Sequence, residues 1–282
     1  MSVTAGAGRK LFRTFARGGG HLQQNQSRNM SNKLNVWNNV RGIERFSLCD
    51  WPGRSSCVLF VGGCNLRCPT CHNGGLAWMP DELPVVDRAR VMSYLDRRKI
   101  WLDGITVTGG EPTMVVDIAA LIDDISCFGL PVKMDSNGMR PDVVQELLQS
   151  GLVHTFAVDV KGPFDKYPAL TGNAVSEPQA AANMERIFEL ASASPQSFYF
   201  RITKVPMLTA EDIETARGYL PTGFTLIEQN FVSPGRNHHA QTNPETGRMP
   251  GDVVSGSDCG SHPEGLEGQR HSGPAAVQAL GA

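Results

Sequence analysis

The sequence predicts an α/β fold built on a parallel sheet. Between Trp37 and Val232, six short apolar runs typical of strands alternate with five segments of helical periodicity. Several of the strand-like runs end in glycine or in polar residues, and in a parallel sheet such ends meet at one edge. A core of roughly 200 residues buries about 70% of the surface of its unfolded chain, so it can fold as one stable domain.

The predicted strands are short and rich in β-branched and aromatic residues. They cover residues 56–61, 104–108, 132–136, 154–160, 198–204 and 224–231. The predicted helices lie at residues 85–98, 115–128, 141–149, 177–193 and 209–219. Pro141 suits a first helical position, and Thr209 with Asp212 forms a candidate capping box. Six such units are too few to close an eight-stranded barrel.

Residues 1–33 differ in composition from the rest of the chain. They carry six basic residues and no acidic residue, whereas the whole chain has a net charge of −2. An arginine-rich segment without acids is typical of a mitochondrial transit peptide. The glycine run at 18–20 and the polar patch at 23–26 favour a disordered extension instead, and a start of translation at Met30 is a third reading. Since few aromatic residues accompany the charge, we expect no nucleic-acid binding.

The amino-acid composition also changes near the end of the chain. Residues 233–282 are rich in Gly, Ser, Pro, His and Gln and show no periodicity, which predicts a disordered, low-complexity tail. No run of 18 apolar residues occurs, so no segment is expected to span a membrane. The predicted organisation is a basic extension at 1–33, a core domain at 34–232 and the tail at 233–282.

Three cysteines follow the first predicted strand at the spacing CxxxCxxC: Cys64, Cys68 and Cys71. Thiolates at this spacing can hold a soft metal centre, but a closed zinc site or an ordinary ferredoxin cluster needs four ligands. One metal position is therefore left open. Pro69 and the Gly62-Gly63 pair indicate a tight, irregular turn.

Three other readings of these cysteines are open at this point. A zinc site would need a fourth ligand, and His72 is badly placed because it adjoins Cys71. Disulfides are disfavoured because the seven cysteines are an odd number, no secretory signal is present and the three are crowded. An electron-transfer cluster would need a remote fourth cysteine, for which the candidates are Cys49, Cys57, Cys127 and Cys259.

The CxxxCxxC spacing resembles the signature of the radical S-adenosylmethionine (SAM) enzymes. The longer stretch Cys49-Asp50-Trp51-Pro52-Gly53, residues 58–63, the cysteines and His72-Asn73 is similar to the glycyl-radical enzyme activating branch, and within it to the activating proteins of anaerobic ribonucleoside-triphosphate reductase. The resemblance implies a partial (β/α)6 barrel with its cofactors at the carboxyl ends of the strands. It also implies that Cys64, Cys68 and Cys71 hold three irons of a 4Fe-4S cluster, while the amino and carboxylate groups of SAM chelate the fourth.

Polar groups at the other strand ends suit the same ligand. Two glycines in Gly109-Gly110-Glu111-Pro112 let the backbone come close to a ligand, and a carboxylate there can receive an ammonium group. Asp159 and Lys161 project to the same side of a strand, which would be the barrel interior. Arg201, within an apolar strand, needs an anion, and both the SAM carboxylate and Glu228 are available.

The resemblance assigns roles to these groups. The GGEP motif at 109–112 contacts the methionyl amino group of SAM, and the Ser136-Asn137-Gly138 and Asp159-Val160-Lys161 motifs line its ribose and carboxylate ends. Thr70 stands where the family often has an aromatic residue, so adenine contact must come from backbone or another side chain. The residues expected to contact SAM are Thr70, Cys71, His72, Gly109, Gly110, Glu111, Asp135, Asn137, Asp159, Lys161 and Arg201.

The implied activity follows from the cofactors. An electron from reduced flavodoxin or ferredoxin cleaves SAM, and the resulting 5′-deoxyadenosyl radical removes a hydrogen atom from a glycine of a partner enzyme, with no protein acid or base required. No second group of cysteines follows the motif, which implies a single cluster. Two alternatives stay open: a radical SAM enzyme acting on a small molecule, such as a deazapurine precursor, and an iron–sulfur electron-transfer protein.

Overall fold

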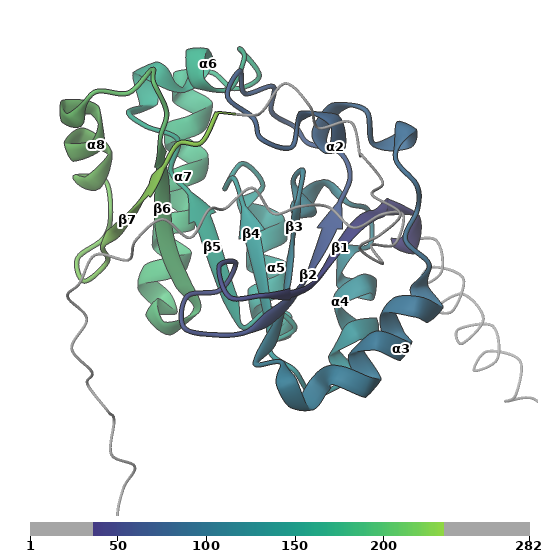
Figure 1. The fold of residues 1–282 in the computed structure, drawn as a ribbon. Helices are drawn as coiled ribbons and strands as arrows, with labels where there is room; N and C mark the ends of the chain where they lie inside the picture. The colour runs from purple at the N-terminus through teal and green to yellow at the C-terminus, as the bar shows by residue number, and fades with distance from the viewer. Residues whose placement is uncertain (1–35, 234–282) are drawn as a thin grey trace, which may run out of the picture.

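The computed structural model describes residues 36–233, which form an α/β domain around one seven-stranded sheet (Figure 1). The strands pair in sequence order; β1 is antiparallel to β2, and every later pair is parallel. The six parallel strands are the predicted partial (β/α)6 barrel. The strands are β1 (Val40–Ser47), β2 (Ser56–Val61), β3 (Gly104–Gly109), β4 (Val132–Ser136), β5 (Thr155–Asp159), β6 (Phe198–Lys204) and β7 (Leu226–Asn230).

The longer helices lie on the outside of the curved sheet (Figure 1). They are α3 (Arg88–Arg98), α4 (Ile118–Ser126), α5 (Pro141–Ser150), α7 (Glu177–Ala193) and α8 (Ala210–Arg217). Two short helices, α2 (Gly74–Trp78) and α6 (Tyr167–Leu170), follow β2 and β5. The remaining helical turns are η1 (Trp37–Asn39), η2 (Pro80–Glu82), η3 (Lys99–Trp101), η4 (Pro112–Met114), η5 (Phe164–Lys166) and η6 (Pro195–Ser197). Pro141 at the start of α5 and the Thr209–Asp212 capping box of α8 are confirmed.

The largest differences from the predicted ranges are at β1 and at two helix starts. The prediction of six strands missed β1, an edge strand interrupted by charged residues and bulges, so it lacks a continuous apolar run. The helix expected from residue 85 starts at Arg88, because the side chain of Asp87 caps it by accepting from Ala89 N. The helix expected from residue 115 starts at Ile118, after Asp117 takes a left-handed conformation with φ of 60°.

Alternation along the strands divides apolar from polar side chains. Val132 and Met134 of β4 belong to the main hydrophobic core, whereas Lys133 and Asp135 alternate with them. Strand β6 repeats the pattern, because Phe200 joins the core and Arg201 does not. Successive side chains of a strand point to opposite faces. The helix-facing side is therefore apolar, and the interior of the barrel carries charge.

The connection between β1 and β2 packs against the amino-terminal ends of strands β3 and β4. Lys133 donates to the Asp50 carbonyl at 2.5 Å, and the Trp51 ring lies so close to Gly104 that a Cβ there would stand 2.4 Å from it. The stretch 49–53 does not line the cavity described below. In this structure it therefore closes the end of the barrel away from the cysteines.

Some predictions concern residues that the structure does not describe. The extension at 1–33 lies outside the described residues, and so does the tail at 233–282 apart from Ser233. Both assignments, and the domain boundaries, stay predictions. No helix within residues 36–233 is long and apolar enough to cross a bilayer.

The buried carboxylate of Asp124 joins η1, α3 and α4, and its removal should destabilise the fold. Asp124 of α4 accepts from Trp37 Nε1 at 2.8 Å and from two nitrogens of Arg88 at 2.6 and 2.7 Å. We expect Asp124→Ala to lower the free energy of unfolding by roughly 2–3 kcal/mol, because both donors lose their buried acceptor. Urea unfolding of the cofactor-free protein measures this.

The matched control is Asp96→Ala, which removes an exposed pair with Lys99. Such pairs contribute about 0–1 kcal/mol. Equal losses in the two variants would contradict the role given to Asp124.

Candidate functional site

A cavity with many polar and charged lining residues opens at the carboxyl ends of strands β2 to β6. Every residue that the sequence predicted for the cluster or for SAM lines it. The side chains come from the cysteine loop (residues 64–73), the turn after β3 and the ends of β4, β5 and β6. Ser136 and Val160, which belong to two of the predicted motifs, line it as well. The lining residues that sequence reasoning did not name for SAM or the cluster are Leu66, Asn73, Thr108, Leu170, Thr203 and Val205.

The cysteine loop forms hydrogen bonds within itself. Cys71 N donates to the Cys68 carbonyl at 3.0 Å, and Leu66 N donates to the Cys64 sulfur at 3.4 Å. Cys64 and Cys68 also pack against the main core. Burial raises the pKa of the Cys64 thiol to about 11 and raises that of Cys71. These thiols stay protonated at neutral pH unless a positive centre binds them.

The turn after β3 packs directly on the start of the cysteine loop. Glu111 N donates to the Gly63 carbonyl at 2.8 Å, and Gly110 N donates to the Val61 carbonyl at 2.9 Å. A Cβ at Gly110 would lie 1.9 Å from the Gly63 oxygen, so no other residue fits. These glycines therefore allow the ends of β2 and β3 to meet, and they also line the cavity, where their approach to a ligand stays a prediction.

Glu111 is 1% exposed, and its carboxylate is already occupied by the protein. One oxygen accepts from Thr113 Oγ1 at 2.6 Å, from Thr113 N at 3.2 Å and from Ser136 Oγ at 2.9 Å. The other accepts from Asn137 N at 2.7 Å. Burial raises the pKa of Glu111, and these hydrogen bonds oppose that shift. The carboxylate therefore braces the end of β3 against the end of β4. Glu111 also lines the cavity, and its expected contact with an ammonium group stays a prediction.

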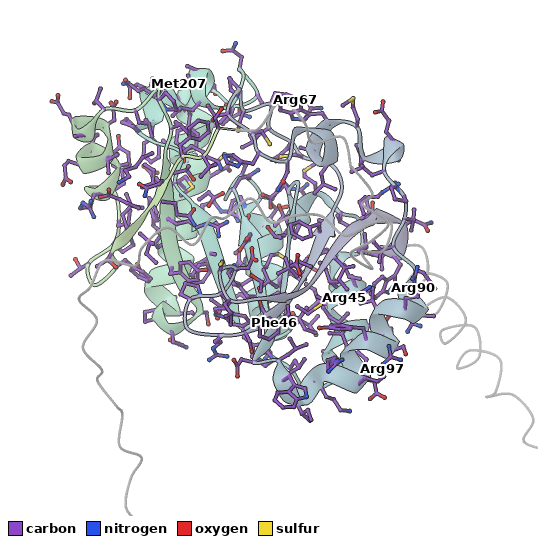
Figure 2. The ribbon with its side chains drawn as sticks, in the orientation of Figure 1. Arg45, Phe46, Arg67, Arg90, Arg97 and Met207 are labelled. Atoms are coloured by element: carbon purple, nitrogen blue, oxygen red, sulfur yellow. The ribbon has the colours of Figure 1, made fainter. Side chains whose placement is uncertain are left out.

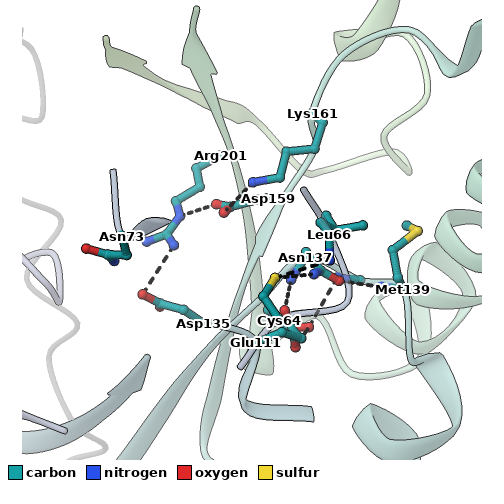
Figure 3. A network of polar contacts seen from close by, with 12 residues as sticks. Cys64, Leu66, Asn73, Glu111, Asp135, Asn137, Met139, Asp159, Lys161 and Arg201 are labelled. Atoms are coloured by element: carbon teal, nitrogen blue, oxygen red, sulfur yellow. Dashed lines mark hydrogen bonds and ion pairs between the residues drawn. The ribbon is translucent and has the colours of Figure 1, made fainter. Parts of the chain in front are cut away.

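Charged side chains of alternating sign run across the barrel interior (Figure 3). Lys133 contacts Asp135 at 2.5 Å, and Asp135 contacts Arg201 at 3.2 Å. Arg201 contacts Asp159 at 2.5 Å, and Asp159 contacts Lys161 at 3.0 Å. We call these five residues the charge chain. Their side chains can stay charged inside the barrel because each lies beside a side chain of opposite charge.

The charge chain also fixes the protonation states of its members. Burial favours the neutral form of Asp159, but Arg201 and Lys161 outweigh it and hold the pKa of Asp159 well below its usual range. Burial likewise disfavours the cation at Arg201, yet Asp135 and Asp159 raise its pKa well above the ordinary value. The anion that Arg201 needs is thus supplied by these aspartates. Glu228, the structural partner considered for Arg201, pairs with Arg217 and Lys204 instead.

The residue that follows the last described strand, β7, contacts the cysteine loop. The ring of Phe231, just after β7, meets the ring of His72 edge to face with centroids 5.4 Å apart. The described chain accordingly ends beside the loop that follows β2 (Figure 1). Asn73, next to His72, donates to the Gly109 carbonyl at 3.4 Å. The end of β3 and the residue after β7 therefore both contact the last two residues of the loop.

The period of two along β6 could have identified one of the missed lining residues. Thr203 lies two positions after Arg201 and therefore faces the same interior. Leu170 carried no such signal, because it belongs to a four-residue helix without periodicity.

The sequence matches the family model of the Radical SAM superfamily over residues 58–220. This range contains every residue that lines the cavity. The chain belongs to the radical SAM superfamily. Radical SAM proteins use a 4Fe-4S cluster and SAM, so these are the cofactors of this chain.

Two relatives illustrate the extent of the similarity. A protein of Methanocaldococcus jannaschii described as a glycyl-radical enzyme activating enzyme is 33% identical over 62% of this chain and 72% of its own length. The pyruvate formate-lyase-activating enzyme of Clostridium pasteurianum is 32% identical over 49% of this chain and 58% of its own length. Among solved structures, SuiB of Streptococcus suis bound to SAM matches at 15% identity and a TM-score of 0.43, covering 80% of this chain and 48% of that one. The assignment does not depend on the last of these.

The residues of the cavity fit a radical SAM cluster. Within residues 36–233 no three His, Cys, Asp or Glu side chains are arranged to hold a single metal ion. A cluster takes one thiolate per iron, so its donors need not converge on one point. Of the cysteines in the described range, only Cys64, Cys68 and Cys71 line the cavity. Cys49, Cys57 and Cys127 lie outside the cavity lining, so none of them is placed as a fourth ligand there. Cys259 lies outside the described residues.

The hydrogen bonds of Glu111 predict the effect of a small change. In Glu111→Gln one oxygen becomes an NH₂ group, which faces donors instead of accepting from them. We expect the free energy of unfolding of the cofactor-free protein to fall by about 2–3 kcal/mol. Urea unfolding measures this, with the exposed Glu146→Gln as a matched control. A Glu111→Gln variant as stable as the control would contradict the bracing role and favour a side chain kept for SAM alone.

Proposed function

We propose that this radical SAM enzyme generates a glycyl radical on a partner enzyme, and that the partner is anaerobic ribonucleoside-triphosphate reductase. The observation that supports activation most is the similarity to the M. jannaschii protein described as a glycyl-radical enzyme activating enzyme, which this chain matches over 72% of that protein. The cavity, which brings together the three cysteines, the GGEP turn and the charge chain, supports radical SAM chemistry in general. The reductase is proposed on the resemblance of residues 49–73 to its activating proteins.

In this proposal Cys64, Cys68 and Cys71 each bind one iron through the thiolate sulfur. What supports this is that all three cysteines line the cavity and that the GGEP turn packs against the start of their loop. When bound, the cluster and SAM supply the reductive cleavage of SAM and the hydrogen abstraction that leaves a radical on a glycine of the partner.

The remaining residues bind and orient SAM. The ends of β4, β5 and β6 present Asn137, Lys161 and Arg201, which donate hydrogen bonds suited to carboxylate and ribose oxygens. Because these cations are already paired with aspartates, they are held in place before SAM arrives. Preorganised charge of this kind costs little reorganisation during the reaction. We further propose reduced flavodoxin or ferredoxin as the electron donor and the cytoplasm as the location.

Loss of any of the three cysteines should abolish the cluster. We expect Cys64→Ala, Cys68→Ala and Cys71→Ala, after anaerobic reconstitution, to keep little iron and to release no 5′-deoxyadenosine from SAM with dithionite. Cys127→Ala is the matched control, because Cys127 is exposed and lies outside the cavity. Iron analysis and chromatography of the products give the answer. A Cys64→Ala enzyme that still cleaves SAM would contradict the proposed ligand set.

The partner is tested by electron paramagnetic resonance. We expect the reconstituted, reduced wild-type enzyme with SAM to form a stable organic radical on anaerobic ribonucleoside-triphosphate reductase and none on pyruvate formate-lyase. A radical on the lyase alone would overturn the choice of partner. Release of 5′-deoxyadenosine with a radical on neither would favour a small-molecule substrate, and no cleavage of SAM at all would favour an electron carrier.

A further inference from the structure

A short segment between β5 and α7 contacts two parts of the site at once. Residues 167–172, which we name the bracing segment, comprise helix α6 followed by Thr171 and Gly172. One end of the segment touches the end of β5, and the other touches the cysteine loop. Leu170, in its middle, lines the cavity.

The first contact holds the Asp159-Val160-Lys161 strand end. Lys161 N donates to the Tyr167 hydroxyl at 3.2 Å, and the Tyr167 side chain is fully buried. The Lys161 ammonium in turn contacts Asp159 at 3.0 Å, and Lys161 lines the same cavity as Cys64, Cys68 and Cys71. Tyr167 therefore fixes the backbone from which this cation extends.

The second contact holds the cysteine loop at its midpoint. Arg67, between Cys64 and Cys68, donates from its backbone N to the Thr171 carbonyl at 3.0 Å. Its guanidinium donates to the Cys64 and Leu66 carbonyls at 2.9 and 3.0 Å. Arg67 lies at the end of the molecule where the loops meet, as Figure 2 shows. A shift of the Arg67 backbone would therefore be transmitted to Cys64 and to Cys68.

Gly172 makes this contact possible. Its φ of +66° lies in the left-handed region, and a Cβ there would stand 2.3 Å from the Arg67 carbonyl oxygen. Since that neighbour is backbone, it cannot rotate away, and the cysteine loop itself would have to move. Gly172 is exposed, so the same substitution does not disturb the hydrophobic core.

We infer that the bracing segment sets the position of the cysteine loop relative to Lys161, and that Gly172 is a positioning residue for the cluster. The inference rests on the proposal that Cys64, Cys68 and Cys71 hold the cluster, but not on the choice of partner. It predicts that displacing this contact weakens cluster retention without unfolding the domain.

The experiment compares Gly172→Ala with Gly151→Ala. Gly151 ends α5 with a φ of +70°, and a Cβ there would meet nothing within 4 Å. Both substitutions therefore carry the same left-handed strain, and only that at Gly172 collides with the loop. A third variant, Gly172→Asn, relieves part of the strain because Asn tolerates this conformation, but it keeps the collision.

Two readouts are used. After anaerobic reconstitution, we expect Gly172→Ala and Gly172→Asn to lose cluster absorbance to an iron chelator roughly tenfold faster than wild type, as for other residues that orient metal ligands. In the cofactor-free protein we expect faster alkylation of Cys64 and Cys68 by iodoacetamide, followed by mass spectrometry. Cys57, fully buried, reports any global unfolding, and the exposed Cys127 reports reagent activity.

The outcomes separate this inference from the proposed function. Faster loss in both Gly172 variants, with Gly151→Ala like wild type and Cys57 protected, supports it. Retention equal to wild type in the Gly172 variants, or equal loss in all three, overturns it. If wild type itself binds no 4Fe-4S cluster, the proposed function fails, and alkylation of the cofactor-free variants still decides whether the bracing segment positions the loop.

Discussion

The site depends on how charge is placed inside the barrel. Parallel strands that alternate apolar and polar residues direct one set toward the helices and the other into the interior, where a charge is stable only beside an opposite charge. The charge chain from Lys133 through Asp135, Arg201 and Asp159 to Lys161 satisfies this condition. Each ion comes from β4, from β6 or from the end of β5, so the pairing also fixes the spacing of these strands. The cavity walls are therefore rigid before any ligand binds.

The cysteine loop is fitted to these walls by contacts from several sides. The GGEP turn meets its start through the Gly63 carbonyl, residue 172 meets its midpoint at Arg67, and Phe231 meets its end at His72. Glu111 joins the same turn to the end of β4 through Ser136 and Asn137. Motif residues that look like ligand contacts in the sequence thus also join one loop to the next. Substitutions in these motif residues are therefore expected to change the stability of the fold as well as SAM binding. Residues that only contacted the ligand would not affect stability in this way.

Much of the fold and the site could be predicted because the signals are local. The end of β5 places Asp159 and Lys161 on one side, and Pro141 and Thr209 mark helix starts by their own chemistry. Other features depend on distant partners. Strand β1 is recognisable only beside β2, since its own charges hide the pattern. The role of Glu111 depends on donors some 25 residues away, and that of Gly172 on a carbonyl at Arg67, so neither could be read from the sequence. The short α6 has no periodicity at all.

The central claim is that three thiolates leave one iron open to the amino acid end of SAM. Electron–nuclear double resonance on the reduced, reconstituted enzyme tests it most directly, with SAM labelled with ¹⁵N at the amino group and ¹⁷O at the carboxylate. The account predicts hyperfine coupling of both labels to the cluster, and loss of the cluster signal in an enzyme lacking Cys64. A cluster that forms without any coupling to labelled SAM, because a fourth protein atom holds that iron, would contradict it.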